Sequence, residues 1–216
     1  GDAETVLNVG AGTGNYEPCD RYVVALEPSA TMRAQRPPGT APAIRGYADD
    51  LPFDDDAFDA VLSVFSDHHW ADRGAGLAEL RRVARSRVVL LTFEPSFFSE
   101  SWLCDYLPGL RAFLPPWDVA RVVEALGGDA TVEPVPLPHD CADEFMHTFW
   151  RRPEALLEPE AADGISLFRR LEPGALATGL QRLRADLDSG AWEAAHPHLV
   201  EALEHDIGIR LVVARP

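Results

Sequence analysis

Short runs of apolar, β-branched residues alternate with helical patterns in the first half of this 216-residue chain, and this alternation constrains its fold more than any other feature. The runs are almost continuously apolar, as is typical of parallel strands buried on both faces of a sheet. Strands are expected at residues 5–9, 22–26, 43–47, 60–65 and 87–93. Two helical faces are also expected, formed by Leu77, Leu80, Val83 and Ala84, and by Val119, Val122, Val123 and Leu126 before Gly127-Gly128. The alternation predicts βαβ units and therefore an α/β fold.

The alternation of strand and helix patterns ends after residue 130. Residues 131–135 and 209–213 have strand patterns, but about seventy residues separate them, which is too many for a hairpin loop. Two helical stripes lie in this interval, with Leu176, Leu180, Leu183 and Leu187 in the first and Trp192, Leu199, Val200 and Leu203 in the second. The interval predicts a helical insertion near the edge of the sheet.

Acidic residues dominate the charge of the chain. It has 35 aspartates and glutamates against 19 basic residues, all of them arginine, so its net charge is −16. Affinity for nucleic acids and anionic membranes comes largely from contacts with phosphates, so neither is an expected partner. The longest purely apolar run, residues 88–91, is far shorter than the ~20 residues that cross a bilayer. Cys19, Cys104 and Cys141 form no CxxC pair, which indicates reduced thiols and a cytoplasmic protein.

A glycine-rich turn directly follows the first expected strand. Gly10, Gly12 and Gly14 have the spacing GxGxG, and glycine lets a backbone pass close to a ligand. A nicotinamide-binding turn has the spacing GxGxxG, and Asn15 stands where that pattern needs glycine. Glu27 ends the second expected strand, where a carboxylate can accept hydrogen bonds from both hydroxyls of a ribose.

A third motif follows in the same order along the chain. It comprises residues 46–53, Gly-Tyr-Ala-Asp-Asp-Leu-Pro-Phe, and residues 58–67, Phe-Asp-Ala-Val-Leu-Ser-Val-Phe-Ser-Asp. With all three motifs, residues 5–95 resemble the class I S-adenosylmethionine-dependent methyltransferases. The closest likeness is to the small-molecule group that includes the ubiquinone and menaquinone biosynthesis enzymes.

The resemblance implies the binding site of the cofactor, S-adenosyl-L-methionine. It places the three glycines around the methionine and ribose parts of the cofactor, and Glu27, followed by Pro28, at the ribose hydroxyls. It places Ala48 and Asp49 beside the adenine, and Ser66 with its neighbours under the sulfonium. Asn8 belongs to the same implied site.

Two residues depart from the family pattern. Asn8 stands where the family usually has aspartate, and Tyr47 stands where an acidic residue often reaches the adenine amino group. Asn8 keeps hydrogen-bonding capacity but lacks the charge, and Tyr47 could stack or pack. We expect both to change the affinity for the cofactor rather than the fold.

The resemblance also implies an architecture. It is a Rossmann-like, doubly wound sheet of about seven strands, the last of them antiparallel, with the insertion as a helical cap over a small acceptor. The expected divisions are a cofactor-binding core at 1–138, a helical cap at 139–205 and the last core strand at 206–216. Since family members enter the first strand from a helix, we expect the native protein to extend upstream of Gly1.

Two histidines follow the fourth expected strand, in the sequence Asp67-His68-His69-Trp70. Open α/β sheets bind ligands at this edge, and imidazole is the commonest general base, so His68 or His69 is a candidate for deprotonating an acceptor. The alternative is that one histidine caps a turn while the other packs against the next helix.

Other candidate residues lie later in the chain. His139, Cys141 and His147 match no recognised zinc spacing, so no metal is predicted. Large aromatic side chains could line an acceptor pocket or form the core of the insertion. The aromatic candidates are Trp70, Trp102, Tyr106, Phe145, Phe149 and Trp150.

The sequence therefore predicts an S-adenosylmethionine-dependent methyltransferase acting on a small-molecule acceptor. A protein that binds S-adenosylmethionine or S-adenosylhomocysteine without catalysis is the alternative. A nicotinamide-dependent oxidoreductase is disfavoured by the glycine spacing. The pattern predicts neither the acceptor nor an oligomeric state.

Overall fold

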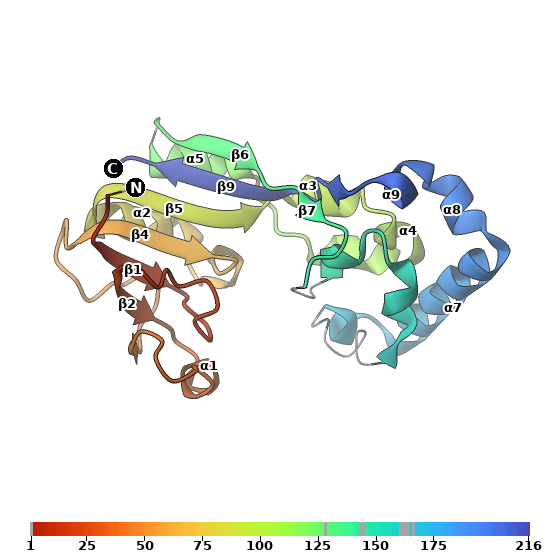
Figure 1. Cartoon of the computed structure of the whole chain (residues 1–216), viewed down its shortest axis with the longest axis horizontal. Helices are drawn as coiled ribbons and strands as arrows, with labels where there is room; N and C mark the ends of the chain where they lie inside the picture. Colours follow the sequence, from red (N-terminus) through yellow and green to blue (C-terminus); the bar gives the residue numbers. More distant parts are fainter. Residues whose placement is uncertain (1, 128, 143–145, 160–164, 166) are drawn as a thin grey trace. The chain divides into compact units, whose positions relative to one another are not determined.

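The chain forms two compact units in the computed structural model, which describes residues 2–127, 129–142, 146–159, 165 and 167–216 (Figure 1). The first, here called the α/β unit, comprises residues up to Phe93 together with Trp117–Pro134 and Arg210–Pro216. The second, here called the helical unit, comprises Glu94–Pro116 and Val135–Ile209. These limits differ from the ranges expected from the sequence, because Glu94–Pro116 groups with the later segment. The three-part division at 1–138, 139–205 and 206–216 stays a prediction.

The α/β unit is built on a mixed sheet of seven strands in the order β3-β2-β1-β4-β5-β9-β6. Neighbouring strands from β3 to β5 pair in parallel, and β9 pairs with β6 in antiparallel register. The predicted Rossmann-like sheet with an antiparallel last strand is confirmed. The strands are β1 Thr5–Val9, β2 Tyr22–Leu26, β3 Ala43–Ile44, β4 Phe58–Val64, β5 Ala84–Phe93, β6 Thr131–Pro134 and β9 Ile209–Ala214.

Two helices pack on each other and on the sheet to form the main core of the α/β unit. Helix α2, Arg73–Val83, begins where Asp72 accepts a hydrogen bond from the Ala75 amide. Helix α5, Val119–Leu126, begins in the same way at Asp118. The expected helical faces are correct except at Ala84, which has extended backbone and starts β5. The chain passes from helix to strand there without an intervening loop.

The connection between β1 and β2 contains no helix, although every residue from 10 to 21 is described. Parallel strands are usually joined by a helix that packs on the sheet. Here the glycine-rich turn is followed only by turns and bends, and the first helix, α1 at Ala30–Ala34, comes after β2. Side chains must therefore fix the shape of this loop.

The helical unit has its own core, which confirms a helical insertion between β6 and β9. Leu183, Trp192 and Leu199 are buried in it as the stripes predicted, but Leu203 lies beyond the last helix and is 72% exposed. Its helices are α3 Pro95–Ser99, α4 Leu103–Tyr106, α7 Pro173–Ser189, α8 Ala191–Ala195 and α9 Pro197–Glu201. Short 3₁₀ turns lie at Pro108–Phe113, Met146–Phe149, Pro153–Leu157 and Phe168–Arg170, and β7 Leu137–Pro138 pairs with β8 Glu204–His205.

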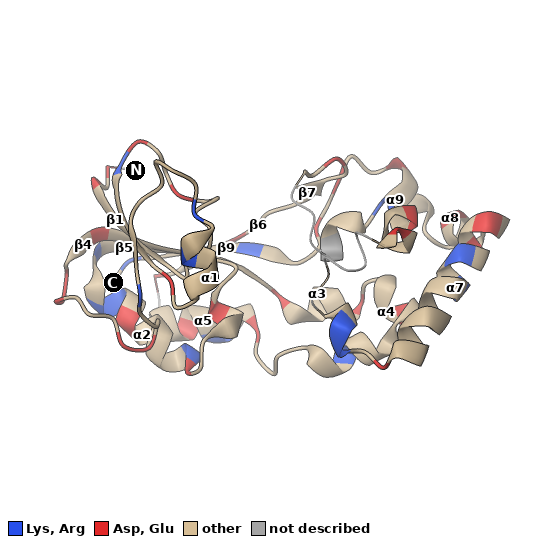
Figure 2. Cartoon of the chain, turned by 90° about the horizontal axis from the view of Figure 1, so that it is seen from below, with Lys and Arg blue, Asp and Glu red and all other residues tan. Residues whose placement is uncertain are grey.

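Acidic positions are distributed over both units (Figure 2). Among the described residues, no helix combines the length and apolar character that a membrane span requires.

Candidate cofactor-binding and active site

The glycine-rich loop leaves β1 with three residues in left-handed backbone conformations, at φ values of 72° for Gly10, 53° for Gly12 and 92° for Gly14. Other L-residues rarely adopt these conformations. A Cβ atom on Gly10 would lie 2.2 Å from Ser66 Oγ, so glycine is required there by packing. A Cβ on Gly12 would meet only Met32 Sδ, at 3.9 Å. The backbone at Gly12 is therefore open to the close approach of a ligand.

Glu27 lies at the carboxyl end of β2, with only 5% of its surface exposed. Its Oε2 accepts a hydrogen bond from the Gly12 amide at 2.9 Å, and its Oε1 accepts one from the Ser29 amide at 2.7 Å. Each carboxylate oxygen has two lone pairs, so both can accept one more hydrogen bond. The carboxylate thus fixes the loop and keeps acceptor capacity for a pair of hydroxyls. The carbonyls of Glu27 and Pro28 are in turn bound by Arg33.

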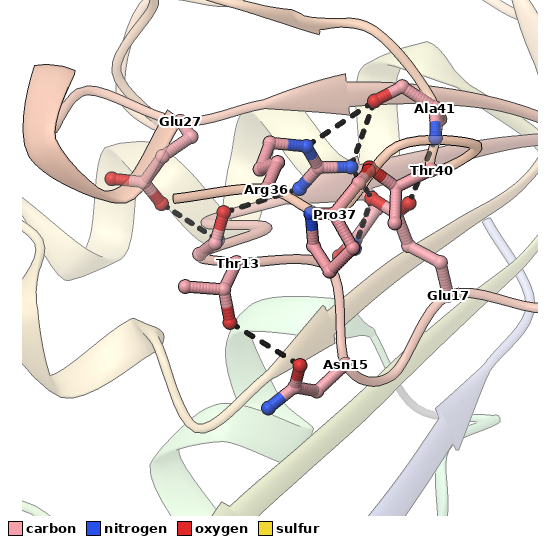
Figure 3. Close-up of polar contacts among 10 residues, drawn as sticks. Thr13, Asn15, Glu17, Glu27, Arg36, Pro37, Thr40 and Ala41 are labelled. Atoms are coloured by element: carbon pink, nitrogen blue, oxygen red, sulfur yellow. Dashed lines mark hydrogen bonds and ion pairs between the residues drawn. The ribbon is translucent and has the colours of Figure 1, made fainter. Parts of the chain in front are cut away.

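Arg36 and Glu17 form a pair that holds the far side of this loop (Figure 3). The side chain of each is 6% exposed, and Arg36 Nη2 lies 2.5 Å from Glu17 Oε1. Arg36 Nη1 donates to the Gly12 carbonyl at 3.1 Å, while its Nε and Nη2 both donate to the Ala41 carbonyl. Glu17 Oε2 accepts from the Ala41 amide at 3.2 Å. The Arg36–Glu17 pair therefore connects the loop to the segment before β3. These contacts take the place of the helix that usually joins two parallel strands.

The same pair explains why Asn8 departs from the family pattern. Asn8 is 3% exposed, and its Nδ2 donates to Glu17 Oε1 at 3.3 Å. Aspartate has no donor and would bring a second carboxylate against Glu17. The carboxylate beside Asn8 is that of Glu17. No sequence pattern indicates the Arg36–Glu17 pair, since 19 residues separate the two and each stands in a polar segment.

The turn after β3 contains the residues expected beside the adenine. Ala48 is buried, Asp49 is half-buried and Tyr47 is 53% exposed. A Cβ on Gly46 would lie 2.6 Å from a methyl group of Leu26, so this turn packs closely on the last residue of β2. Tyr47 is thus an exposed residue rather than a packed one.

Ser66 belongs to a tight turn after β4. Its hydroxyl donates to the Val9 carbonyl at 3.1 Å, lies 2.8 Å from the Ser63 hydroxyl and accepts the indole N–H of Trp70 at 3.2 Å. The Trp70 ring also fills the space beside Gly76 of α2. These contacts fix the turn against the end of β1.

A buried ion pair supports the 3₁₀ turn Asp67–His69 that follows. Asp67 is 0% exposed, accepts hydrogen bonds from Arg73 Nε at 2.8 Å and from Arg73 Nη2, and accepts another from the Thr92 hydroxyl at 2.9 Å. The guanidinium of Arg73 stacks on the Trp117 ring at 3.4 Å from its centroid. Asp67 ends the third sequence motif, but no local pattern in the sequence indicates Arg73 as its partner. Since the charges of Asp67 and Arg73 are paired, they fix the position of the turn that carries His68 and His69.

His68 and His69 lie side by side, with ring centroids 3.9 Å apart. His68 also contacts Phe93, and its Nδ1 is buried without a hydrogen-bond partner in the part of the chain that the structure describes. Burial, the largest cause, and the neighbouring His69 together lower the pKa of His68 to about 4, while Asp67 acts in the opposite direction. His68 is therefore a neutral imidazole near pH 7 and a weak base. His69 is exposed.

Comparisons with known proteins agree with this geometry. Residues 7–92 match the family described as "Methyltransferase domain". The crystal structure of a putative methyltransferase from an antibiotic biosynthesis pathway of Anabaena variabilis matches with a TM-score of 0.87 and 32% identity, over 99% of this chain and 91% of that one. The chain belongs to the class I S-adenosylmethionine-dependent methyltransferases.

Curated relatives match this chain over shorter stretches. Demethylmenaquinone methyltransferase of Mycolicibacterium gilvum is 36% identical over 97 residues, which is 42% of this chain and 42% of the relative. The uncharacterized protein YafE of Escherichia coli is 54% identical over 41 residues, which is 19% of this chain and 20% of the relative. The chain therefore spans less than half the length of these two relatives.

The α/β unit fits the family's cofactor, S-adenosyl-L-methionine, in two respects. The open backbone at Gly12 leaves room for a ligand beside the loop. The buried carboxylate of Glu27 can still accept two hydroxyl donors. Of the residues implied by the resemblance, the structure brings Gly10 and Ser66 into contact, and it joins Gly12 to Glu27 by a hydrogen bond.

The aromatic candidates Trp102, Tyr106, Phe149 and Trp150 lie together in the helical unit, each at most 8% exposed. They contribute to the core of that unit, and their predicted place in an acceptor pocket stays a prediction. The Tyr106 hydroxyl donates to Asp186 at 2.7 Å, and the Trp102 indole donates to the Trp150 carbonyl at 3.1 Å. Phe145 lies outside the described residues.

The metal-ligand candidates are only partly visible. The side chain of His147 lies outside the described part of the structure, and His139 and Cys141 are in the helical unit. No group of three histidine, cysteine or acidic side chains arranged to hold a metal ion occurs among the described residues.

Proposed function

We propose that this protein transfers the methyl group of S-adenosyl-L-methionine to a small-molecule acceptor. The observation that carries the proposal is the joint arrangement of the open GxGxG loop and the buried Glu27 carboxylate, which share a hydrogen bond at Gly12. The residues proposed to bind the cofactor are Asn8, Gly10, Gly12, Gly14, Glu27, Pro28, Ala48, Asp49 and Ser66.

The cofactor supplies a methyl group on a sulfonium, which is already a good leaving group. The task of the protein is to align the acceptor with that methyl group and to exclude water. Good alignment alone can contribute ~7–11 kcal/mol to catalysis. The paired charges of Asp67 and Arg73 suit this task, because they fix the turn that presents the histidines.

His68 and His69 have different proposed parts. With a pKa of about 4, His68 is too weak a base to take a proton efficiently near pH 7, and its Nδ1 is buried, so its part is to hold the neighbouring His69 ring in position. His69 is exposed and can pass a proton to solvent. We therefore propose His68 as the orienting group and His69 as the proton acceptor.

A small molecule is the acceptor that the charge of the chain supports best. A net charge of −16 disfavours nucleic acid, because phosphates would be repelled. The relatives named demethylmenaquinone methyltransferases have, by their name, a small-molecule acceptor. Location in the cytoplasm stays a prediction from the cysteine pattern.

Incubation with S-adenosylmethionine labelled at the methyl group, against a panel of phenols, amines, thiols and quinols, tests the proposal. Label recovered in a small-molecule product is the expected result. Tight binding of the cofactor with no transfer to any class would favour the non-catalytic binding protein. Tighter binding of NADH than of S-adenosylmethionine would favour an oxidoreductase.

A further inference from the structure

The strand order of the sheet reverses between β1 and β4. From β1 the chain continues through β2 to β3 on one side of the sheet, and it then adds β4 and β5 on the other side. Open α/β sheets bind ligands outside the carboxyl ends of the strands at such a point. Two aromatic residues flank it, Tyr16 in the loop that follows β1 and Phe65 directly after β4.

The rings of Tyr16 and Phe65 contact each other at this edge of the sheet. Their centroids are 6.2 Å apart and their planes are 75° apart, which is an edge-to-face arrangement. Tyr16 is 46% exposed and Phe65 is half-buried. Neither side chain belongs to the described core of the α/β unit. The pair therefore presents aromatic surface at the carboxyl edge of the sheet.

Phe65 has a backbone conformation that aromatic residues rarely adopt. Its φ of 49° lies in the left-handed region, which is strained for a bulky side chain. The Phe65 amide donates to the Leu91 carbonyl at 2.8 Å, and the hydroxyl of the next residue, Ser66, donates to the Val9 carbonyl. Bonds to β5 and β1 thus hold the strained residue in place. Glycine would adopt this conformation without strain, so phenylalanine indicates a role for the ring.

The carboxylates nearest to the two rings along the chain are paired with arginine. Glu17 pairs with Arg36, and Asp67 pairs with Arg73. Asn8, where the family usually has aspartate, carries no charge. None of these side chains offers an unpaired negative charge to a ligand. A cation bound at this edge would therefore be recognised by aromatic faces, which attract positive charge.

We propose that the rings of Tyr16 and Phe65 contact the sulfonium of S-adenosyl-L-methionine and recognise its positive charge. The inference rests on the proposed function and adds to it the residues that distinguish the cofactor from its product. S-adenosylhomocysteine has a neutral sulfur, so the aromatic faces attract it less strongly. The pair thereby favours binding of the cofactor before methyl transfer and release of the product after it.

The two ligands differ by one methyl group and one charge, so the ratio of their dissociation constants reports the recognition of the charge. Calorimetry on the full chain measures both constants. Tyr16→Leu and Phe65→Gly are each expected to weaken binding of S-adenosylmethionine about fivefold and to change binding of S-adenosylhomocysteine less than about twofold. Phe65→Gly also relieves the left-handed backbone, so the ring is removed without harm to the fold. Tyr16→Phe keeps an aromatic ring and should retain the ratio of the parent.

Tyr22→Leu is the matched control. Tyr22 is 69% exposed and lies at the amino end of β2, so its loss should change neither dissociation constant. If Tyr16→Leu and Phe65→Gly weakened both ligands equally, or weakened neither, the rings would only pack between two loops and the inference would be wrong. If the parent bound neither ligand, the proposed function itself would fail, and this inference with it.

Discussion

At the scale of single residues, Asn8 and Glu17 act as one unit beneath the glycine-rich loop. Asn8 donates to the carboxylate that also pairs with Arg36, so the side chain of Asn8 is matched to a partner nine residues away. The sequence shows that Asn8 departs from the family pattern, but it could not predict the reason, which is the hydrogen bond from Asn8 to Glu17. Only the folded loop brings Glu17 against the first strand.

Asn8→Asp, the change toward the family pattern, is therefore expected to lower both the stability of this protein and its affinity for the cofactor. It sets a second carboxylate beside Glu17 in a buried place, which should cost about 1–3 kcal/mol of stability and weaken cofactor binding. Urea unfolding and calorimetry measure the two effects. Asn8→Asp combined with Glu17→Gln should recover part of both losses. An Asn8→Asp variant as stable as the parent would contradict the assigned contact.

His68 predicts a pH dependence of stability. Its folded pKa of about 4 lies below the ordinary value of 6.5, so the unfolded chain binds this proton more readily. Stability from this residue is present above pH 6.5 and is lost as the pH falls toward 4, by up to about 3 kcal/mol. His68→Phe keeps the ring contacts with His69 and Phe93 and should flatten the profile. The free energy of unfolding is measured with urea at several pH values. If it fell by the same amount between pH 7 and pH 5 in the parent and in His68→Phe, that would be evidence against a buried neutral His68.

At the scale of elements, the positions of the strands could be predicted from the sequence. The contacts that hold the loop after β1 could not. β1 and β2 have the expected bounds because each is a short, nearly continuous apolar run between polar turns. β3 is shorter than expected, since only Ala43 and Ile44 pair with β2 before Gly46 packs against Leu26. The loop after β1 takes its shape from Arg36, which no local pattern relates to Gly12.

Arg36→Met should accordingly impair cofactor binding more than it impairs the fold. It removes the bonds to the Gly12 and Ala41 carbonyls and leaves Glu17 unpaired, so we expect about tenfold weaker binding of S-adenosylmethionine. Arg36→Lys keeps one charge and should restore part of the affinity.

Arg111→Met is the matched control for this variant. Arg111 also binds two carbonyls and a carboxylate, but all of them are in the helical unit. Its loss should leave cofactor affinity unchanged in calorimetry. If the two methionine variants bound the cofactor equally well, Arg36 would have no special part in the loop.

At the scale of the whole molecule, the chain builds two cores. The end of the strand–helix alternation after residue 130 predicted the helical insertion, because the leucine stripe on α7 is regular. It could not predict that Glu94–Pro116 joins the same core, because that grouping depends on contacts between distant segments. The aromatic candidates could be pocket or core residues. Trp102, Tyr106, Phe149 and Trp150 are buried in the core of the helical unit, and a contact of any of them with an acceptor stays a prediction.

Leu183→Ala tests the separateness of these cores. Leu183 is 0% exposed in the core of the helical unit, so its truncation should cost about 2–5 kcal/mol of stability. Leu80→Ala makes the same change in the core of the α/β unit. We expect only Leu80→Ala to reduce affinity for S-adenosylmethionine under native conditions. An equal reduction in both variants would mean that the units do not behave as independent cores.

Calorimetric titration of the parent protein and of Glu27→Ala tests most directly whether S-adenosylmethionine binds at Glu27 and the glycine-rich loop. We expect the parent to bind S-adenosylmethionine and Glu27→Ala to bind it about 1–3 kcal/mol more weakly, because hydrogen bonds to a charged acceptor are lost. Glu79→Ala, which removes another carboxylate that accepts a backbone amide, should retain the parent's affinity if it stays folded. An unchanged dissociation constant in a folded Glu27→Ala variant would contradict the account.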